Sequence, residues 1–281
     1  DWSSDVCSSD LNEADMTVSC VEVPVEEAAG QFGVMTVDES GRVIAFNEKP
    51  EHPASIPGEE GICLASMGNY VFNTEFLYEQ VIKDADTPGS DHECGKNIIP
   101  SIIDHYRVFA YPFRDPKTQK QAYWRDVGTL DAYWEANMEL VSVSPQLDLY
   151  DNQWPIFTDQ LQSPPAKFVF DYPGRRGEAI ESMVSAGCII SGSSVRKSLI
   201  FSNCRIHSHS LIEESLILPE CEVMEHCTIR GAIIDRGCVI PAGTQIGVDL
   251  DADRERGFRV TKRGHTLVTP DMLEQKLHVT R

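Results

Sequence analysis

Aliphatic residues recur every 17 positions between Ile189 and Ile246, in three interleaved series. The series are Ile189, Ile206, Val223 and Ile240; Val195, Ile212, Ile229 and Ile246; and Ile200, Ile217 and Ile234. Within each repeat the anchors are separated by 6, then 5, then 6 residues, so the short step falls at the same place in every copy. This spacing predicts a coil with three flat sides, which is a parallel β-helix.

Small residues stand two positions before most anchors, where strand alternation points a side chain to the same face. They are Cys204, Cys221 and Cys238; Ser193, Ser210, Cys227 and Thr244; and Ser198, Ser215 and Ala232. We therefore expect a bore lined by aliphatic and small residues. Four of the nine cysteines occupy these inward positions, which favours reduced core thiols over a disulfide framework.

The first half of the chain shows strand and helix patterns in alternation. Strands are predicted at 16–23, at 33–37 and 42–46 as a hairpin, at 64–72, at 108–113, and ending at 123–126. Helices are predicted after Asn73, with Phe76, Leu77 and Val81 on one face; around Ile98, Ile99, Ile102 and Ile103; and after Thr129, with Leu130, Tyr133, Trp134 and Leu140 aligned. This alternation is typical of an α/β domain.

Charge limits the partners of the chain. Its 281 residues carry 24 Lys and Arg against 44 Asp and Glu, a net charge of −20. Such a chain repels nucleic acid and anionic membranes, so any anionic ligand needs a local cationic site. No run of residues is apolar enough for a membrane span, and no secretion signal is evident. We expect a cytoplasmic protein with no nucleic-acid or membrane partner.

Two positions of the α/β part suit phosphate chemistry. Glu48 and Lys49 stand side by side before Pro50, where a strand must end. Lys49 could take a phosphate and Glu48 could accept hydrogen bonds from sugar hydroxyls, although a solvated charge pair has the same pattern. Asp126 precedes a predicted helix at the carboxyl end of a predicted strand, where a carboxylate suits Mg²⁺ or merely favours the helix dipole.

Three ordered segments carry a family resemblance that spans residues 12–281. They are Phe46 to Pro50, Ala65 to Tyr70 and Tyr123 to Thr129. In this order they resemble the bacterial ADP-glucose pyrophosphorylases, which join a Rossmann-like α/β nucleotidyltransferase domain to a left-handed parallel β-helix. The resemblance implies that Gly33, Glu48, Lys49, Ser66, Tyr70 and Trp124 bind glucose 1-phosphate. It also implies that Asp126 holds Mg²⁺ with a second aspartate from upstream.

The implied reaction belongs to glycogen and starch biosynthesis. A phosphate oxygen of glucose 1-phosphate attacks the α-phosphorus of ATP, giving ADP-glucose and pyrophosphate, with Lys49 orienting the phosphate and Asp126 holding the metal. The family's glycine-rich phosphate loop and second metal aspartate have no counterpart before Met16, so we expect a truncated domain that is inactive alone. The family's Ser-His-Asp-Phe-Gly-Lys-Asp loop reads differently here, at 91–97, so we assign that loop no role.

Domain limits follow from these patterns. Residues 1–11 resemble a translated adapter and are expected to be non-native; 12–141 form the C-terminal portion of the nucleotidyltransferase domain; 142–182 are a linker; 183–250 are the β-helix; and 251–281 are a tail with a strand and a helix.

Other functions stay open at this stage. An acyltransferase is suggested by the β-helix and by His207, His209 and His226, but the repeat has no inserted loop. Zinc binding by two groups of residues is disfavoured because strand parity turns the cysteines inward and most of the histidines outward. The groups are Cys204, His207 and His209, and Cys221, His226 and Cys227. Another sugar-1-phosphate nucleotidyltransferase, or a catalytically silent regulatory or structural subunit, is also possible.

Regulation and assembly are implied by the resemblance alone. The family's β-helix joins subunits into a homotetramer and helps to form effector sites. In this chain the basic stretch from Arg254 to Arg263 could bind an anionic effector, with Arg256 and Arg259 as the candidate residues. Solvated tail charge is the alternative.

Overall fold

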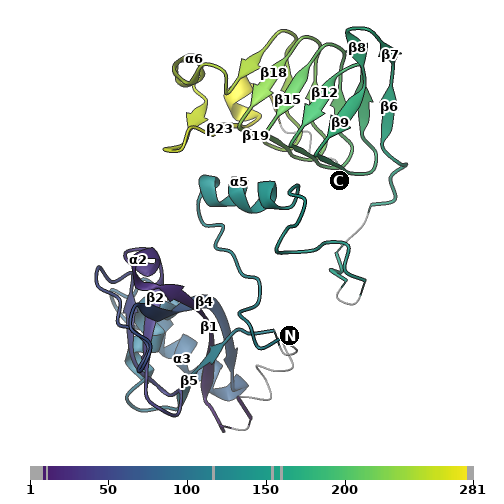
Figure 1. Ribbon diagram of the computed structural model, residues 1–281. Helices are drawn as coiled ribbons and strands as arrows, with labels where there is room; N and C mark the ends of the chain where they lie inside the picture. Colours follow the sequence, from purple (N-terminus) through teal and green to yellow (C-terminus); the bar gives the residue numbers. More distant parts are fainter. Residues whose placement is uncertain (1–8, 11, 116–117, 153–154, 159–160, 277–281) are drawn as a thin grey trace. The chain divides into compact units, whose positions relative to one another are not determined.

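The computed structural model describes residues 9–10, 12–115, 118–152, 155–158 and 161–276. These residues form two compact units, 1–124 and 125–281, and each is described by itself (Figure 1). Apart from Ser9 and Asp10, the segment predicted to be non-native, 1–11, lies outside the described residues. None of the described helices is long and apolar enough to cross a membrane.

The first unit is a mixed five-stranded sheet with the strand order β3-β2-β4-β1-β5. Its elements are β1 Met16–Pro24, α2 Val25–Ala28, β2 Gly33–Val37, β3 Val43–Glu48, β4 Ile62–Phe72, α3 Thr74–Ala85, the π-helical turn η1 Cys94–Ile98, α4 Ile99–Ile102 and β5 Val108–Pro112. Strand β1 runs antiparallel to β4 and parallel to β5, and β2 and β3 form the predicted hairpin. The α/β pattern of the sequence is confirmed.

Helix α3 differs from its prediction in the face that it buries. Asn73 caps the helix as expected, because its side chain accepts a hydrogen bond from the Glu75 amide at 3.1 Å. Phe76 and Gln80 are the buried residues, whereas Val81 is 46% exposed. The spacing of four residues places Phe76 and Gln80 one above the other. A polar residue therefore stands at a core position, and a sequence pattern of apolar residues could not show it.

The strand end predicted at Tyr123–Asp126 is wrong. These residues form neither helix nor strand. The boundary between the two units falls between Trp124 and Arg125. Because residues 123–126 cross this boundary, they have no single sheet with which their backbone could pair, and no strand forms.

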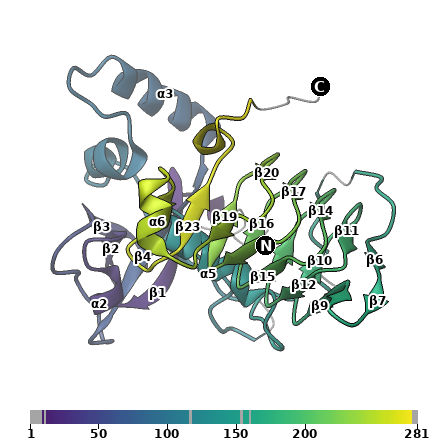
Figure 2. The same cartoon turned by 90° about the horizontal axis from the view of Figure 1, so that it is seen from above.

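The second unit contains a parallel β-helix with three sheets. Its strands are β6 Lys167–Val169, β7 Asp171–Tyr172, β8 Arg175–Arg176, β9 Glu178–Ile180, β10 Met183–Val184, β11 Ile189–Ser191, β12 Ser194–Arg196, β13 Leu199–Ile200, β14 Arg205–Ile206, β15 Leu211–Glu213, β16 Leu216–Ile217, β17 Glu222–Val223, β18 Thr228–Arg230, β19 Ala232–Ile234, β20 Val239–Ile240, β21 Gln245–Ile246, β22 Arg259–Val260 and β23 Thr266–Val268. The sheets have the orders β20-β17-β14-β11-β6, β21-β18-β15-β12-β9 and β10-β13-β16-β19-β23-β22. Figure 2 shows the strands of the first sheet side by side, from β20 to β6.

The predicted anchors fill the bore, with one exception. Ile206, Val223 and Ile240 pair in register and are fully buried. In the first coil the residue paired with Ile206 is Ile190, which is fully buried, and the predicted anchor Ile189 is only half-buried. The first coil is therefore one residue shorter than the sequence period predicts.

The small inward residues form a ladder of hydrogen bonds along the bore. The Ser198 hydroxyl accepts from the Ser215 amide at 3.1 Å, and the Ser215 hydroxyl accepts from the Ala232 amide at 3.1 Å. The Cys204 thiol donates to the Leu218 carbonyl at 3.2 Å. Burial raises the pKa of the Cys238 thiol to about 12. Cys238 therefore acts as a protonated packing residue and not as a thiolate.

The β-helix extends beyond the predicted limits of 183–250. Strands β6 and β9 lie in the predicted linker, 142–182, and pair with β11 and β12. Strand β23 lies in the predicted tail and pairs with β19. Two excursions conceal these coils from a search for a fixed period: the hairpin β7–β8, and the segment holding helix α6, Leu250–Glu255, with strand β22. The predicted C-terminal helix is a single turn, η2 Asp271–Leu273.

Helix α5, Leu130–Glu139, belongs to the second unit, so the observed boundary differs from the predicted one at 141. Thr129 caps the helix as expected, accepting from the Ala132 amide at 3.1 Å. The apolar face of the helix packs on the outer side chains of one sheet, namely Leu199, Leu216 and Ile233. The indole of Trp134 donates to the Glu214 carbonyl at 3.0 Å. This packing attaches α5 to the β-helix.

His265 makes the attachment of α5 sensitive to pH. Its ring stacks on Trp134 with centroids 4.0 Å apart, and its Nε2 lies 4.0 Å from Asp131 Oδ1. Burial lowers the pKa of His265, and nearby Arg263 acts in the same direction, while Asp131 and Glu214 oppose the shift. The unfolded chain then binds a proton more readily than the folded one, so the second unit should lose stability as pH falls below about 6.5.

Unfolding by urea at several pH values between about 5 and 8 measures this effect. The substitution His265→Gln should flatten the pH dependence, because glutamine does not titrate. An equally steep loss of stability in the variant would show that other groups cause it.

Candidate functional site

The carboxylate of Glu48 is the point at which three elements of the first unit meet. Glu48 ends strand β3. A methyl group added at Gly33 of β2 would stand 2.8 Å from Glu48 Oε2, and one added at Gly95 of η1 would stand 2.9 Å from the same atom. Both distances are shorter than a carbon atom tolerates. The two glycines therefore leave room for the carboxylate between β2 and η1.

Glu48 has one acidic and one basic neighbour that act on its pKa. Burial raises the pKa of Glu48, and the neighbouring Glu93 raises it further, while Lys49 lowers it. Lys49 itself is exposed, and its backbone has a φ of 48° in the left-handed region. Its amide donates to the Phe32 carbonyl at 3.1 Å. This turn leaves the ammonium group accessible to an anion beside the Glu48 carboxylate.

Strand β4 contributes two hydroxyl groups to the same place. Burial raises the pKa of Tyr70; a hydrogen bond with the Ser66 side chain opposes the shift, and Cys94, Glu48 and Glu93 add to it. All four residues therefore act on the ionisation of Tyr70. The predicted residues Gly33, Glu48, Ser66 and Tyr70 come together, although they are spread over three strands.

Sequence reasoning missed part of this site. Glu93, Cys94 and Gly95 belong to the loop to which we assigned no role, yet Glu93 and Cys94 act on the ionisation of Tyr70, and Gly95 backs against Glu48. The Gly-Lys pair at 95–96 was the available signal, because a glycine there permits close approach of the backbone.

Trp124 lies at the edge of the first unit. Its ring meets that of Phe32 edge-on, with centroids 5.8 Å apart and an interplanar angle of 67°. Phe32 precedes Gly33 and accepts the Lys49 amide through its carbonyl. Trp124 is therefore connected through Phe32 to the strand end that carries Lys49.

Asp126 belongs to the second unit, which is described separately from the residues above. Its side chain is exposed, and Oδ1 accepts from the Gly128 amide at 3.1 Å. No hydrogen bond or ion pair to another described residue engages Oδ2. One carboxylate oxygen is thus available to a cation, which fits Mg²⁺ because that ion takes one or two carboxylates together with phosphate and water oxygens.

No other metal site is evident among the residues that the structure describes, where no group of three His, Cys, Asp or Glu side chains could hold an ion. In the β-helix, His207 Nε2 lies 2.7 Å from Glu222 Oε1, and His209 stacks on His226 with centroids 4.9 Å apart. The cysteines point inward, as described above. The residues of the zinc hypothesis therefore do not converge.

The two arginines of the predicted effector site have different surroundings. The guanidinium of Arg256 pairs with Asp253, which is fully buried, and also donates to the Gln245 carbonyl. Arg259 is exposed on strand β22. Arg256 thus has a structural partner within its own unit, which the spacing of basic residues did not indicate.

Comparison with known proteins agrees with the two-part organisation. A nucleotidyl transferase family model matches residues 6–143, and a GlmU-like, C-terminal hexapeptide model matches residues 164–268. The second match fits the parallel β-helix predicted from the repeat and the left-handed form that the resemblance implies.

Relatives named glucose-1-phosphate adenylyltransferase match almost the whole chain. The one from Shewanella sp. (strain ANA-3) is 61% identical over 260 residues, which are 92% of this chain and 62% of the relative. The one from Saccharophagus degradans is 64% identical over 263 residues, which are 94% of this chain and 62% of the relative. The chain thus spans about 62% of the length of these relatives. By sequence, therefore, the chain is similar to proteins named glucose-1-phosphate adenylyltransferase, and its matches place a nucleotidyl transferase region before a hexapeptide-repeat region.

Proposed function

We propose that the first unit binds glucose 1-phosphate, and that the whole protein transfers the adenylyl group of ATP to this sugar phosphate with release of pyrophosphate. The observation that carries the proposal is the meeting of Glu48, Lys49, Ser66 and Tyr70 at one place on the sheet. A cation beside a carboxylate and two hydroxyl groups offers one partner for a phosphate and several for sugar hydroxyls.

Each residue has a role that its surroundings support. The exposed Lys49 ammonium holds the phosphate as a point charge, and the Glu48 carboxylate accepts hydrogen bonds from sugar hydroxyls. Tyr70 and Ser66 donate to or accept from the same hydroxyls. Gly33 and Gly95 leave the room that the carboxylate occupies. The protein supplies positioning and charge, because the nucleophile is an oxygen of the sugar phosphate itself.

Mg²⁺ is the metal that we propose for this reaction, with Asp126 as one ligand. When bound, it would offset negative charge at the α-phosphate. ATP as the nucleotide, the homotetramer, the cytoplasmic location, the effector role of Arg256 and Arg259, and the place in glycogen synthesis stay predictions from the resemblance.

Calorimetric titration of the 281-residue chain with glucose 1-phosphate tests the first step. We expect saturable binding, and Lys49→Met should weaken it at least about tenfold, because a charge-assisted hydrogen bond to the phosphate is lost. Lys167→Met, which removes an exposed lysine of strand β6, is the matched control and should bind as the unchanged chain does.

Equal affinity in the two variants would contradict the role of Lys49. Complete absence of binding by the unchanged chain would contradict the proposed function and would favour a structural or regulatory subunit.

A further inference from the structure

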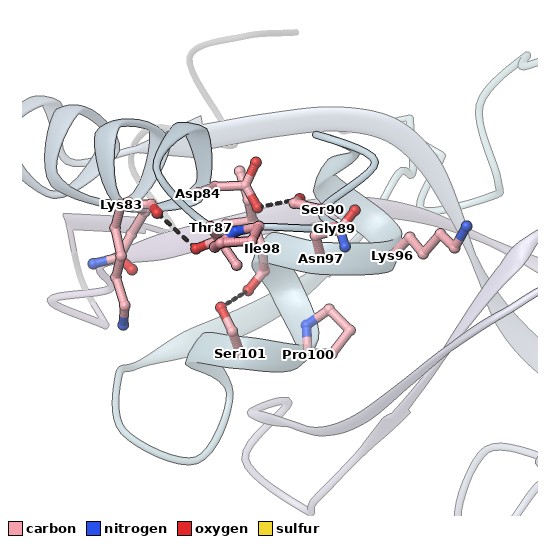
Figure 3. Close-up of a pocket in the computed structure, with 12 residues that line it drawn as sticks. Lys83, Asp84, Thr87, Gly89, Ser90, Lys96, Asn97, Ile98, Pro100 and Ser101 are labelled. Atoms are coloured by element: carbon pink, nitrogen blue, oxygen red, sulfur yellow. Dashed lines mark hydrogen bonds between the residues drawn. The ribbon is translucent and has the colours of Figure 1, made fainter.

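A groove lies in the first unit between the end of helix α3 and the segment 87–101 (Figure 3). It encloses about 550 Å³. Its lining includes Gln80, Lys83, Thr87, Ser90, Asn97 and Ser101, and none of the residues of the proposed sugar-phosphate site is among those that line it. The groove is therefore a separate feature of the unit.

Gln80 is the unusual residue of this groove. It is 97% buried, since its exposure is 3%, and it occupies a core position of α3. Its Nε2 atom has no hydrogen-bond partner among the described residues. A buried amide without an acceptor costs about 1–3 kcal/mol. The last torsion of glutamine is soft, so a half turn of the amide exchanges its nitrogen and oxygen and offers the N–H groups to an acceptor in the groove.

The other polar groups of the groove divide into donors and acceptors. Three hydroxyls already donate to protein oxygens: Thr87 to the Lys83 carbonyl at 2.8 Å, Ser90 to Asp84 at 2.7 Å and Ser101 to the Ile98 carbonyl at 2.7 Å (Figure 3). These hydroxyls keep lone pairs for a ligand's own hydroxyl groups. Lys83 is exposed at the end of α3 and supplies positive charge.

The carboxylate that lines the groove already has hydrogen-bond partners of its own. Asp84 accepts from Ser90 and lies 2.9 Å from His92 Nδ1, and these hydrogen bonds lower its pKa. Lys96, the second lysine of the lining, pairs with Asp91. Lys83 forms no such pair with a described residue. The groove thus combines one available cation, an amide without an acceptor and several hydroxyl acceptors.

The geometry points to a binding site for a small hydroxylated anion, a phosphate or carboxylate that also carries hydroxyl groups, held by Lys83 and the Gln80 amide. The ligand's anionic oxygens accept from Lys83 and Gln80, and its hydroxyls donate to Thr87, Ser90 or Ser101. The turn η1 lines the groove with Lys96, Asn97 and Ile98, while Gly95 of the same turn backs against Glu48. One turn therefore borders both sites.

Two-dimensional ¹⁵N–¹H spectra of the deuterated 281-residue chain, titrated with glycerol 3-phosphate and separately with glycerate, test this site. We expect the amide signals of Thr87, Ser90, Asn97 and Ser101 to shift with one dissociation constant. Lys83→Met should raise that constant about tenfold. A response to only one of the two compounds would identify the anionic group that the groove takes.

Lys49→Met is the matched control, because glycerol 3-phosphate could also enter the proposed sugar-phosphate site. In that variant the signals of Gly33 and Ser66 should cease to respond, while those of the groove respond as before. Shifts confined to Gly33, Lys49 and Ser66 in the unchanged chain would overturn the groove site and leave the proposed function intact.

Gln80→Met separates a binding role from a structural one. Methionine has a similar length and removes the amide without an acceptor, so the melting temperature should stay the same or rise by about 2–4 °C. Ligand affinity should nevertheless fall several-fold. Unchanged affinity in a stably folded Gln80→Met chain would contradict the part assigned to this amide.

Discussion

Replacing Asp253 with alanine is expected to lower the free energy of unfolding of the second unit by roughly 3 kcal/mol. Asp253 is fully buried in the excursion that carries α6. Its carboxylate accepts from the Gly247 amide at 2.7 Å and from the Thr266 hydroxyl at 2.9 Å, and it pairs with Arg256. Alanine would leave these donors without an acceptor. Because Thr266 begins β23, the last coil of the β-helix should loosen together with the excursion.

Guanidinium unfolding followed by circular dichroism measures the effect, and hydrogen exchange at 247–268 locates it. Asp251→Ala is the matched control, since that side chain is 89% exposed and pairs with Arg254 on the helix surface. An exposed pair of this kind contributes less than about 1 kcal/mol. Similar losses of stability in the two variants would show that the buried carboxylate contributes no more than an exposed carboxylate on the same helix.

The same network changes how an effector experiment at Arg256 must be interpreted. Removing Arg256 leaves the Asp253 carboxylate buried without its counter-charge, so a loss of regulation in Arg256→Ala could arise from unfolding of the excursion. Arg259 does not have this complication, because it is exposed on β22. Arg259→Ala is therefore the variant that tests effector binding in the basic stretch.

The repeat made the β-helix the most predictable part of the chain. A strict period of 17 residues fixes which side chains point inward, because strand alternation and coil length must both be satisfied. Prediction failed where the period changes. The first coil is one residue shorter, so Ile190 takes the place of Ile189, and the hairpin β7–β8 and the α6 excursion conceal the outermost coils.

The candidate site was predictable only where one segment carries its own signal. Glu48 and Lys49 are adjacent in the sequence, and Pro50, which ends a strand, follows them directly. They could therefore be found without a structure. The role of η1 could not be, because Gly95 approaches Glu48 through the fold, across 47 residues of chain. Gln80 could not be predicted either, because a polar residue on an amphipathic helix is expected to face solvent. In the structure, tertiary packing buries it.

Replacing Ile229 with alanine should destabilise the second unit by about 2–5 kcal/mol. Ile229 is fully buried in the bore and stacks in register between Ile212 and Ile246. Removing its side chain beyond Cβ leaves a cavity that the coil cannot close, because the backbone on each side is fixed by hydrogen bonds to neighbouring coils. Guanidinium unfolding of the variant should show a lower midpoint with the same slope.

Val239→Ala is the control that separates packing in the bore from β propensity. Val239 lies on β20 of the same β-helix, but its side chain is 41% exposed. Its replacement removes a β-branched residue without opening a cavity, so a loss of no more than about 1 kcal/mol is expected. If Ile229→Ala cost no more than this control, stacking of the anchors would not be the main source of stability, and the hydrogen bonds between coils would have to supply it.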